Sequence, residues 1–423
     1  MRRNFVFHLH PAWVAERTLK PATTFGLGIL TLTFSAALAA TGALLMIYYV
    51  PSTREALAST QDIQYAVAYG SFVRAVHRWA AHGMVLAAFL HLLRVAFCGA
   101  YFRRKLNWVI GLHLFLFTLG LAFTGYLLPW DQRSFWAVSV SAALLDCVPW
   151  AGEWLKRLLL GGPEVGQPAL VRFYALHVAI LPGLMAGLVA LHLWRIRKDG
   201  GLVRGRSEAS GEAPVVPAWP HLVLREAILV LALLTLVCLA GTLVAAPLGG
   251  APDVHNPSSP QKTPWYFLWL QEMVSYSAPI GAGVFPGVVL LALLLLPFLE
   301  REEDGVGRWF GPPGRRMAIG VSAAVALVSF ILLELVFLQQ GVASWLASGP
   351  APVRDLLNPA AGMLVVALVV FAAAGRRARS ARTACLAAGA VLLVAVIGFG
   401  VVGWCRGPMW VFFWPWEEWS LVP

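Results

Sequence analysis

The segment SFVRAVHRWAAHGMVLAAFLHLLR, residues 71–94, decides the fold, because it is a long apolar helix that carries histidines at two depths. At about 1.5 Å of rise per residue, His77 and His91 lie roughly 21 Å apart along the axis, near opposite edges of a hydrocarbon layer about 30 Å thick. Fourteen steps of about 100° leave their side chains within about 40° of each other around the helix. The two histidines therefore face the same way.

A second apolar segment, residues 170–195, repeats the arrangement with His177 and His192, which are fifteen residues apart on one face. Ionisable side chains inside a membrane span are costly, so four histidines at two levels need a partner at each level. A haem iron held between helices of a bundle is the partner that takes two facing imidazoles. We therefore predict bis-histidine ligation of haem at both levels.

Isolated histidines give a contrasting case, because a single histidine in a membrane helix is more often a hydrogen-bonded packing residue than a ligand. His82 lies about 140° around the helix from His77 and about 180° from His91, so it points away from the ligand face. We expect His82 and His113 to be packing residues.

The composition is that of a membrane protein. Of 423 residues, 59% are hydrophobic and the mean hydropathy is +0.72, far outside the range of soluble proteins. We predict an all-α polytopic membrane bundle of nine transmembrane helices, with a haem-binding four-helix bundle in the N-terminal half. The nine apolar runs are residues 24–50, 72–98, 107–128, 169–195, 221–246, 280–299, 315–338, 355–374 and 381–404.

The net charge of +11 does not indicate a nucleic-acid partner, because basic clusters fall in alternate loops between the apolar runs. Loops rich in Lys and Arg are cytoplasmic in membrane proteins. We therefore predict a multi-pass protein of the bacterial inner membrane, with its N terminus cytoplasmic and its C terminus outside. No cleavable signal peptide is evident, since the first apolar run is long enough to span. An interfacial helix is expected before it, over residues 4–21.

This topology sets the pairing of the histidines. Both histidine helices run from outside to inside, so His77 pairs with His177 near the outer surface and His91 with His192 near the inner one. We expect two b-type haems, neither of them covalent, because the five cysteines include no CxxCH motif for a c-type haem.

Glycines repeat the interval of fourteen residues. Gly28 and Gly42 lie in the first apolar run, and Gly111 and Gly125 lie in the third. Because glycine lets another body approach the helix backbone closely, two levels of glycine suit two flat macrocycles. Close helix–helix packing is the alternative.

Three arginines, Arg74, Arg78 and Arg94, flank the histidine levels. They are candidates for charge-assisted hydrogen bonds to haem propionates. Snorkelling of long basic side chains to the membrane edge would explain them equally well.

The chain resembles cytochrome b of the quinol–cytochrome c oxidoreductases in five motifs. The fifteen-residue interval between His177 and His192 is similar to the cytochrome b6 branch of this family. The motifs are VHRWAAHGMVLAAFLHLLR (76–94), LNWVIG (106–111), TGYLLPWDQRSFWAV (124–138), GQPALVRFYALH (166–177) and LHLWRIRKDG (191–200).

The resemblance divides the chain into three parts. It is strong over residues 1–199, which look like a b6-type haem-binding four-helix domain. Residues 200–217 form a polar, Gly-rich cytoplasmic linker. Residues 218–423 are similar, more weakly, to the C-terminal cytochrome b half with its outer quinol-site loop.

The family implies a function. Quinol is oxidised at the outer side, one electron passes to a Rieske iron–sulfur protein and on to a c-type cytochrome, and the other crosses two b haems to an inner quinone site, coupled to proton translocation. The family also implies a homodimeric complex in membrane lipid. The matching outer-site residues are Tyr126, Pro129, Trp130, Asp131, Phe135, Trp136, Trp265 and Tyr266, and those of the inner site are Arg197, Lys198 and Asp199.

Simpler explanations exist for these site residues. Aromatic residues and proline at a membrane edge also form ordinary interfacial belts, and positive-inside clusters contain Arg and Lys without any quinone.

The sequence departs from the family at the outer loop. The family commonly has Pro-Glu-Trp-Tyr there, with a glutamate thought to accept a quinol proton, whereas this chain has Pro264 at that position. Glu272 is the nearest carboxylate and a candidate replacement; an interfacial glutamate without a role is the alternative. The b6 branch also attaches an extra haem to a cysteine in the first span, but Gly26 stands there, so no such attachment is expected.

Two other functions compete with this one. A b-haem membrane anchor of another quinone-linked oxidoreductase would lack electron bifurcation at a Rieske centre, and Pro264 keeps it open. A haem-free proton-coupled transporter would use the intramembrane histidines as a proton relay.

Overall fold

The computed structural model describes residues 12–148, 150–201, 214–257, 261–299, 305–338 and 350–413, and their regular secondary structure is helical apart from one small two-stranded sheet. Within these ranges nine helical segments are long and apolar enough to cross a membrane, which confirms the predicted all-α membrane bundle. They are α3 (Leu27–Tyr48), α5 (Gly70–Phe97), α6 (Lys105–Leu127), α9 to α10 (Gln167–Lys198), α12 (Ala218–Leu243), η4 with α14 (Pro279–Leu299), α15 (Pro313–Leu338), α18 (Pro359–Ala378) and α19 (Ala381–Trp404).

The chain packs as two compact units. The first draws on Met1–Ser134, Gly166–Ala251 and Glu303–Gly311, and the second on Phe135–Val165, Pro252–Glu302 and Pro312–Pro423. The predicted division at residues 200–217 follows sequence resemblance rather than packing, and it stays a prediction.

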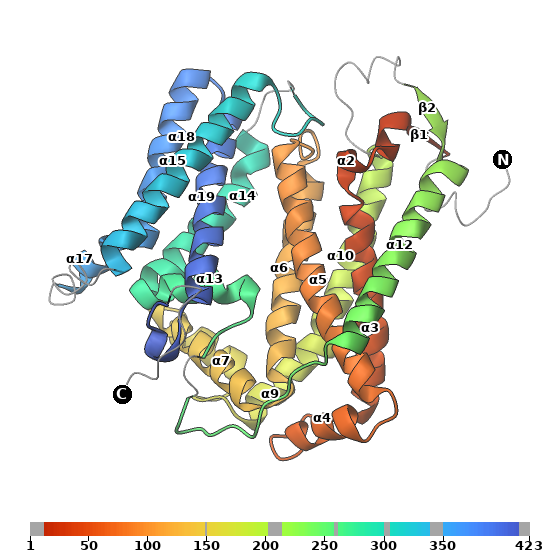
Figure 1. Ribbon diagram of the computed structural model, residues 1–423, viewed down its shortest axis with the longest axis vertical. Helices are drawn as coiled ribbons and strands as arrows, with labels where there is room; N and C mark the ends of the chain where they lie inside the picture. Colours follow the sequence, from red (N-terminus) through yellow and green to blue (C-terminus); the bar gives the residue numbers. More distant parts are fainter. Residues whose placement is uncertain are drawn as a thin grey trace. The chain divides into compact units, whose positions relative to one another are not determined.

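In the first unit, α3, α5, α6 and the segment from α9 (Gln167–Ala175) through the π-helix η3 (Leu176–Ile180) to α10 (Leu181–Lys198) pack together, and α12 lies against α3 and α5 (Figure 1). Small residues permit this close packing. The Phe34 ring of α3 occupies the space that a side chain at Gly83 of α5 would fill, and Val76 of α5 lies against Gly241 of α12. Phe34, Val76, Ala80, Met84, Ala87, Met185 and Val237 form the buried core of this bundle.

Shorter elements connect these helices. They include α2 (Pro21–Thr24) and α4 (Ala56–Tyr65). The expected interfacial helix at the N terminus is wrong for residues 12–20. Strand β1 (Trp13–Ala15) pairs antiparallel with β2 (Val215–Pro217), and a 3-10 turn, η1 (Glu16–Leu19), follows it.

In the second unit α19 is the central helix, packed by α13 (Trp265–Tyr276), α15 and α18. Its Phe399 ring meets Phe330 of α15 edge to face at 5.0 Å between centroids, and Phe285 of α14 (Phe285–Leu299) packs on the same ring. The π-helix η4 (Pro279–Val284) leads into α14. Three short helices, α7 (Gln132–Ala143), α8 (Gly152–Leu160) and α17 (Ala351–Leu356), and two 3-10 turns, η2 (Leu144–Cys147) and η5 (Pro408–Trp410), complete the described elements.

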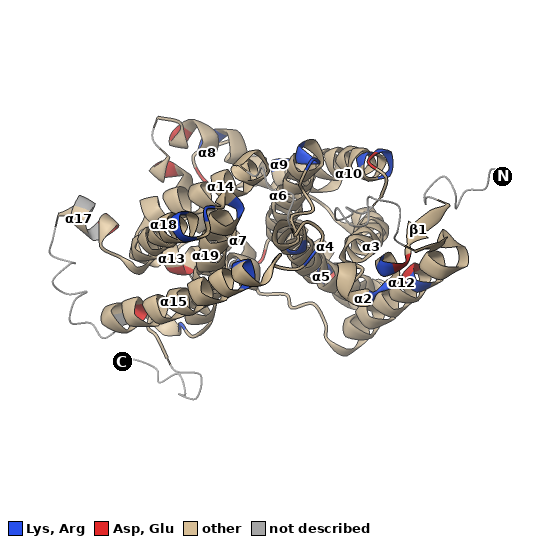
Figure 2. Cartoon of the chain, turned by 90° about the horizontal axis from the view of Figure 1, so that it is seen from above, with Lys and Arg blue, Asp and Glu red and all other residues tan. Residues whose placement is uncertain are grey.

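Charged residues are scarce along the membrane-spanning helices. Figure 2, which looks along the helices, shows that most of the ribbon is neither Lys, Arg, Asp nor Glu. The last turn of α10 carries Arg195, Arg197 and Lys198. The long helices therefore present almost entirely apolar surfaces, as a bilayer requires.

Candidate functional site

The outer histidine pair lies inside the first unit. His77 of α5 and His177 of η3 face each other with ring centroids 6.2 Å apart and ring planes inclined by 69°. Bonds from imidazole nitrogen to a metal are about 2 Å long, so one metal atom between two rings at this separation would meet a nitrogen of each. The helices therefore bring together two side chains that fit a single iron.

Hydrogen bonds fix which nitrogen of each outer histidine is available. Nδ1 of His177 lies 3.0 Å from the Leu121 carbonyl oxygen, which can only accept, so Nδ1 carries the proton. Nδ1 of His77 lies 2.9 Å from the Thr41 hydroxyl. With Nδ1 engaged in both rings, Nε2 keeps its lone pair for a metal, as in other metal-bound histidines.

Each outer histidine lies against a Thr-Gly pair of the neighbouring helix. A side chain at Gly125 would overlap the His177 ring, and one at Gly42 would meet Cε1 of His77 at 3.3 Å. The hydroxyl of Thr124 lies 3.3 Å from Nδ1 of His177, matching the role of Thr41. Sequence reasoning found the glycines but missed the threonines. The repeated Thr-Gly dipeptide was the signal.

The inner pair, His91 and His192, also lies against glycines of neighbouring helices. His91 and His192 lie near enough for their charges to interact. A Cβ at Gly28 would meet Cε1 of His91 at 3.7 Å, and one at Gly111 would meet Cε1 of His192 at 3.5 Å. All four predicted glycines thus lie against the four histidines, one to each. In this structure the space beside each of these glycines is occupied by an imidazole ring.

The π-helix η3 explains why the two histidine intervals differ. Leu176–Ile180 has the wider π turn, whereas α5 is regular from His77 to His91. A π turn absorbs one extra residue within an α-helix. The fifteen-residue interval of the second helix therefore presents its histidines on one face, as fourteen residues do in α5.

The two other membrane histidines lie apart from these pairs. His113 is exposed on α6, and its Nδ1 bonds to the Val109 carbonyl in its own helix at 2.8 Å. His82 packs beside the Trp79 ring of α5. Neither faces another histidine among the described contacts.

Two of the three flanking arginines hold other chain segments. Arg74 donates from Nε to Gln64 at 2.7 Å and from Nη2 to the carbonyl oxygens of Ala246 and Pro247. Arg94 is buried and donates from Nε to the Thr23 carbonyl at 3.1 Å. A propionate role for Arg74, Arg78 and Arg94 stays a prediction and would use their remaining N–H groups.

The outer quinol-site residues are distributed over both units. In the first unit Tyr126 ends α6, and Pro129, Trp130 and Asp131 follow it. Asp131 is buried, and it accepts hydrogen bonds from the backbone N–H of Ser134 at 2.9 Å and of Gly249 at 2.7 Å. This carboxylate fastens the loop after α6 to the segment after α12.

The remaining outer-site residues lie in the second unit. Phe135 and Trp136 meet edge to face on α7, and the Trp136 indole donates to the Asp253 carbonyl at 2.9 Å. Trp265 and Tyr266 form the first turn of α13, directly after Pro264, with their rings 5.3 Å apart.

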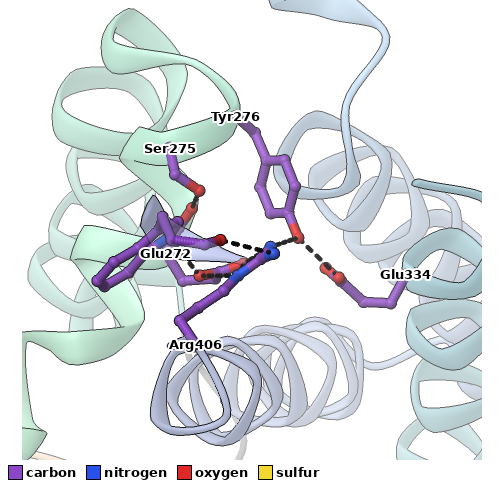
Figure 3. A network of polar contacts seen from close by, with 6 residues as sticks. Glu272, Ser275, Tyr276, Glu334 and Arg406 are labelled. Atoms are coloured by element: carbon purple, nitrogen blue, oxygen red, sulfur yellow. Dashed lines mark hydrogen bonds and ion pairs between the residues drawn. The ribbon is translucent and has the colours of Figure 1, made fainter. Parts of the chain in front are cut away.

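Glu272 is not an interfacial glutamate, because its side chain is fully buried. Its carboxylate is held by Arg406, with contacts of 3.0 and 3.1 Å from Nε and a further one from Nη2 (Figure 3). The Trp410 indole donates to the same carboxylate at 3.1 Å. Arg406 was missed by sequence reasoning, since nothing local marks a partner so distant along the chain.

The predicted inner quinone residues end α10. Asp199 lies 3.7 Å from Arg195, and its carbonyl oxygen accepts from Arg104 at 2.9 Å. The Lys198 ammonium lies 5.0 Å from the centre of the Trp194 ring. These contacts hold the helix end, and Arg197, Lys198 and Asp199 stay predicted quinone residues.

Comparisons with known proteins identify the family. The family model described as "Cytochrome b(N-terminal)/b6/petB" matches residues 82–251. The menaquinol:cytochrome c reductase cytochrome b subunit of Geobacillus thermodenitrificans is 44% identical over 161 residues, covering 38% of this chain and 72% of the relative. Cytochrome b of Cereibacter sphaeroides is 31% identical, covering 64% of this chain and 67% of the relative.

A solved structure has a similar fold over most of the chain. A chain of a hyperthermophilic respiratory Complex III matches with a TM-score of 0.68 at 23% identity, covering 93% of this chain and 96% of that one. The sequence relatives, the matched helical fold and the two histidine levels agree, and they confirm the resemblance found in the motifs. This chain belongs to the cytochrome b/b6 family.

Proposed function

We propose that the chain is the cytochrome b subunit of a quinol–cytochrome c oxidoreductase and carries electrons across the membrane. One observation supports this above all others. Two histidine pairs lie at two levels of one membrane bundle, and each of the four rings lies against a glycine. Such a pair is what a non-covalent b-type haem requires.

The residues of each pair have separate roles. Nε2 of each histidine would bind the iron, and the hydrogen bonds at Nδ1 of His77 and His177 hold the rings in orientation. A haem bound by two imidazoles supplies one-electron transfer. The protein contributes ring orientation, an apolar surrounding and a fixed separation between the two levels.

Quinol oxidation is assigned to the outer side and quinone reduction to the inner side of a bacterial cytoplasmic membrane, with the N terminus inside. The relatives named above include a menaquinol:cytochrome c reductase subunit. A Rieske iron–sulfur protein and a c-type cytochrome are the partners proposed for this chain, within a homodimeric complex. The residues around Pro129 and Trp265 are proposed to line the outer quinol site.

Glu272 is the proposed replacement for the proton acceptor missing at Pro264. Its ion pair with Arg406 would have to open for the carboxylate to take a proton. Changing Glu272 to Gln is expected to slow quinol oxidation by the complex while leaving both haems in place. Turnover equal to that of the parent complex would remove this assignment.

The histidine variants test the main proposal. His91→Ala and His192→Ala are each expected to remove one b-type component from the reduced-minus-oxidised spectrum of the purified protein. His113→Ala is the matched control, because this membrane histidine is exposed and bonds only within its own helix in the described contacts. Equal pigment loss in all three variants would contradict the proposal.

A b-haem anchor without a Rieske centre is the second candidate, favoured only by proline at position 264. Both functions predict two b-type components, whereas a haem-free transporter predicts none. Purification of the complex from its native membrane distinguishes the subunit of a quinol–cytochrome c oxidoreductase from the b-haem anchor. A Rieske protein that co-purifies in stoichiometric amount supports bifurcation, and its absence from an active quinone-linked complex supports the anchor.

A further inference from the structure

The second unit contains a polar network that the proposed haem chemistry does not use. Glu272 and Tyr276 of α13, Glu334 of α15 and Arg406 after α19 converge in it (Figure 3). Polar groups buried within a membrane bundle are costly and often functional. The network holds two carboxyl groups and one guanidinium.

The guanidinium is committed to Glu272. Arg406 contacts both oxygens of that carboxylate and donates to the Tyr276 hydroxyl at 3.0 Å. Burial by itself would lower the pKa of Arg406, but the hydrogen bonds and negative charge of Glu272 raise it above its ordinary value. Arg406 and Glu272 therefore form a closed pair with no net charge.

Glu334 is left without a cation of its own. It is 4% exposed, and its Oε2 accepts a hydrogen bond from the Tyr276 hydroxyl at 2.8 Å. Its Oε1 is buried, with no hydrogen-bond partner in the part of the chain described. Burial and the charge of Glu272 raise the pKa of the Tyr276 phenol, so that hydroxyl keeps its proton and remains a donor.

Apart from Arg406, which is already paired with Glu272, the described neighbours of Glu334 add no compensating charge. The Phe399 ring of α19 lies against Tyr276, and α14 carries no charged residue. Asp355 of α17 accepts a hydrogen bond from Ser277 at 2.7 Å and brings no cation. Cations lie near the opposite ends of the packed helices, since residues 315 and 334 of α15 are roughly 28 Å apart along the axis. These cations are Arg315, Arg376, Arg377 and Arg382.

An isolated carboxylate in such surroundings is much less stable than the neutral acid. We propose that Glu334 is a proton-binding site, whose carboxyl group carries its proton on Oε1 while Oε2 accepts the Tyr276 hydroxyl. The ligand is a single proton. The proposal goes beyond the electron-transfer function and does not depend on it, because it rests on residues of the second unit alone.

Infrared spectroscopy of the purified full-length protein at neutral pH tests this proposal. The carbonyl band of a buried carboxylic acid is expected, and it is lost in Glu334→Gln. Glu153→Gln is the control, since it replaces an exposed glutamate outside the network and should leave that band in place. Tyr276→Phe should shift the band, because the hydrogen bond to Oε2 is removed.

Thermal unfolding gives a second readout that separates a neutral acid from a charged one. Replacing a neutral acid by an amide changes no charge, so Glu334→Gln should keep the melting temperature of the parent protein, whereas Glu272→Gln should lower it by leaving Arg406 unpaired. An acid band that survives in Glu334→Gln would overturn the proposal. So would a fall in melting temperature equal to that of Glu272→Gln.

Discussion

At the scale of single residues, the two proposed haem sites rest on four histidines and four glycines. Intervals of fourteen and fifteen residues, read with helix geometry, predicted these eight positions. The structure places one glycine against each histidine ring. The threonines were not predicted, because Thr41 and Thr124 also bond to backbone carbonyls of their own helices, as threonines in membrane helices commonly do.

The effect of replacing a glycine by alanine on haem binding should differ between the outer and the inner level. A side chain at Gly125 would overlap the His177 ring, whereas one at Gly28 would meet His91 at an ordinary contact distance of 3.7 Å. Gly125→Ala is therefore expected to abolish the outer haem component of the absorption spectrum, while Gly28→Ala keeps both components. Full pigment in Gly125→Ala would show that the His177 ring has room to move.

Removing the Thr41 hydroxyl should weaken the outer site. Hydrogen bonds to metal-bound histidines commonly contribute about 10- to 100-fold in metal affinity. Since Thr41 lies 2.9 Å from Nδ1 of His77, Thr41→Val should lower haem affinity at the outer level by about tenfold, as measured by haem titration of the apoprotein. Thr31→Val is the control, because the Thr31 hydroxyl bonds only to the Gly28 carbonyl in the described contacts. Equal affinity in both variants would contradict a role for Thr41.

At the scale of elements, the positions of the nine spans followed from hydropathy, whereas two local structures did not. The π turn at Leu176–Ile180 is a backbone adjustment that apolar periodicity does not reveal. The pairing of β1 with β2 joins segments about 200 residues apart. Local sequence therefore favoured a helix where a strand forms.

The π turn makes a testable prediction about helix register. Deleting Ala179 should convert η3 to a regular helix, shorten the second histidine interval to fourteen residues and leave both haems bound. Deleting Val85 from α5, which has no π turn, should rotate His91 by about 100° and abolish one haem component. Loss of haem in the Ala179 deletion, or its retention in the Val85 deletion, would contradict this explanation.

At the scale of the whole molecule, the chain packs as two units. Its resemblance to cytochrome b is strong over residues 1–199 and weaker over residues 218–423. In the first unit, apolar runs were sufficient to predict the membrane-spanning helices, and the spacing of the histidines led to the predicted pairs. In the second unit, sequence reasoning singled out Glu272 but not its partner, because the ion pair with Arg406 spans 134 residues. Contacts between residues so far apart in the sequence depend on the packing of α13 against α19, and no short motif indicates that packing.

The Glu272–Arg406 pair should stabilise the second unit only as a pair. Removing one partner of a buried ion pair commonly costs about 3–5 kcal/mol, while replacing both by apolar groups is often neutral. Arg406→Leu should therefore strongly lower the free energy of unfolding, and adding Glu272→Leu should restore most of it. Denaturant or thermal unfolding measures both. Additive losses in the double variant would mean that the two side chains do not act together.

The central claim is that one membrane bundle holds two b-type haems between paired histidines. A redox titration of the purified chain, followed by its absorption bands, tests it most directly. The account predicts two b-type components that titrate separately, one of them lost in His91→Ala or His192→Ala. A colourless protein, or a pigment content unchanged by those substitutions, would contradict it.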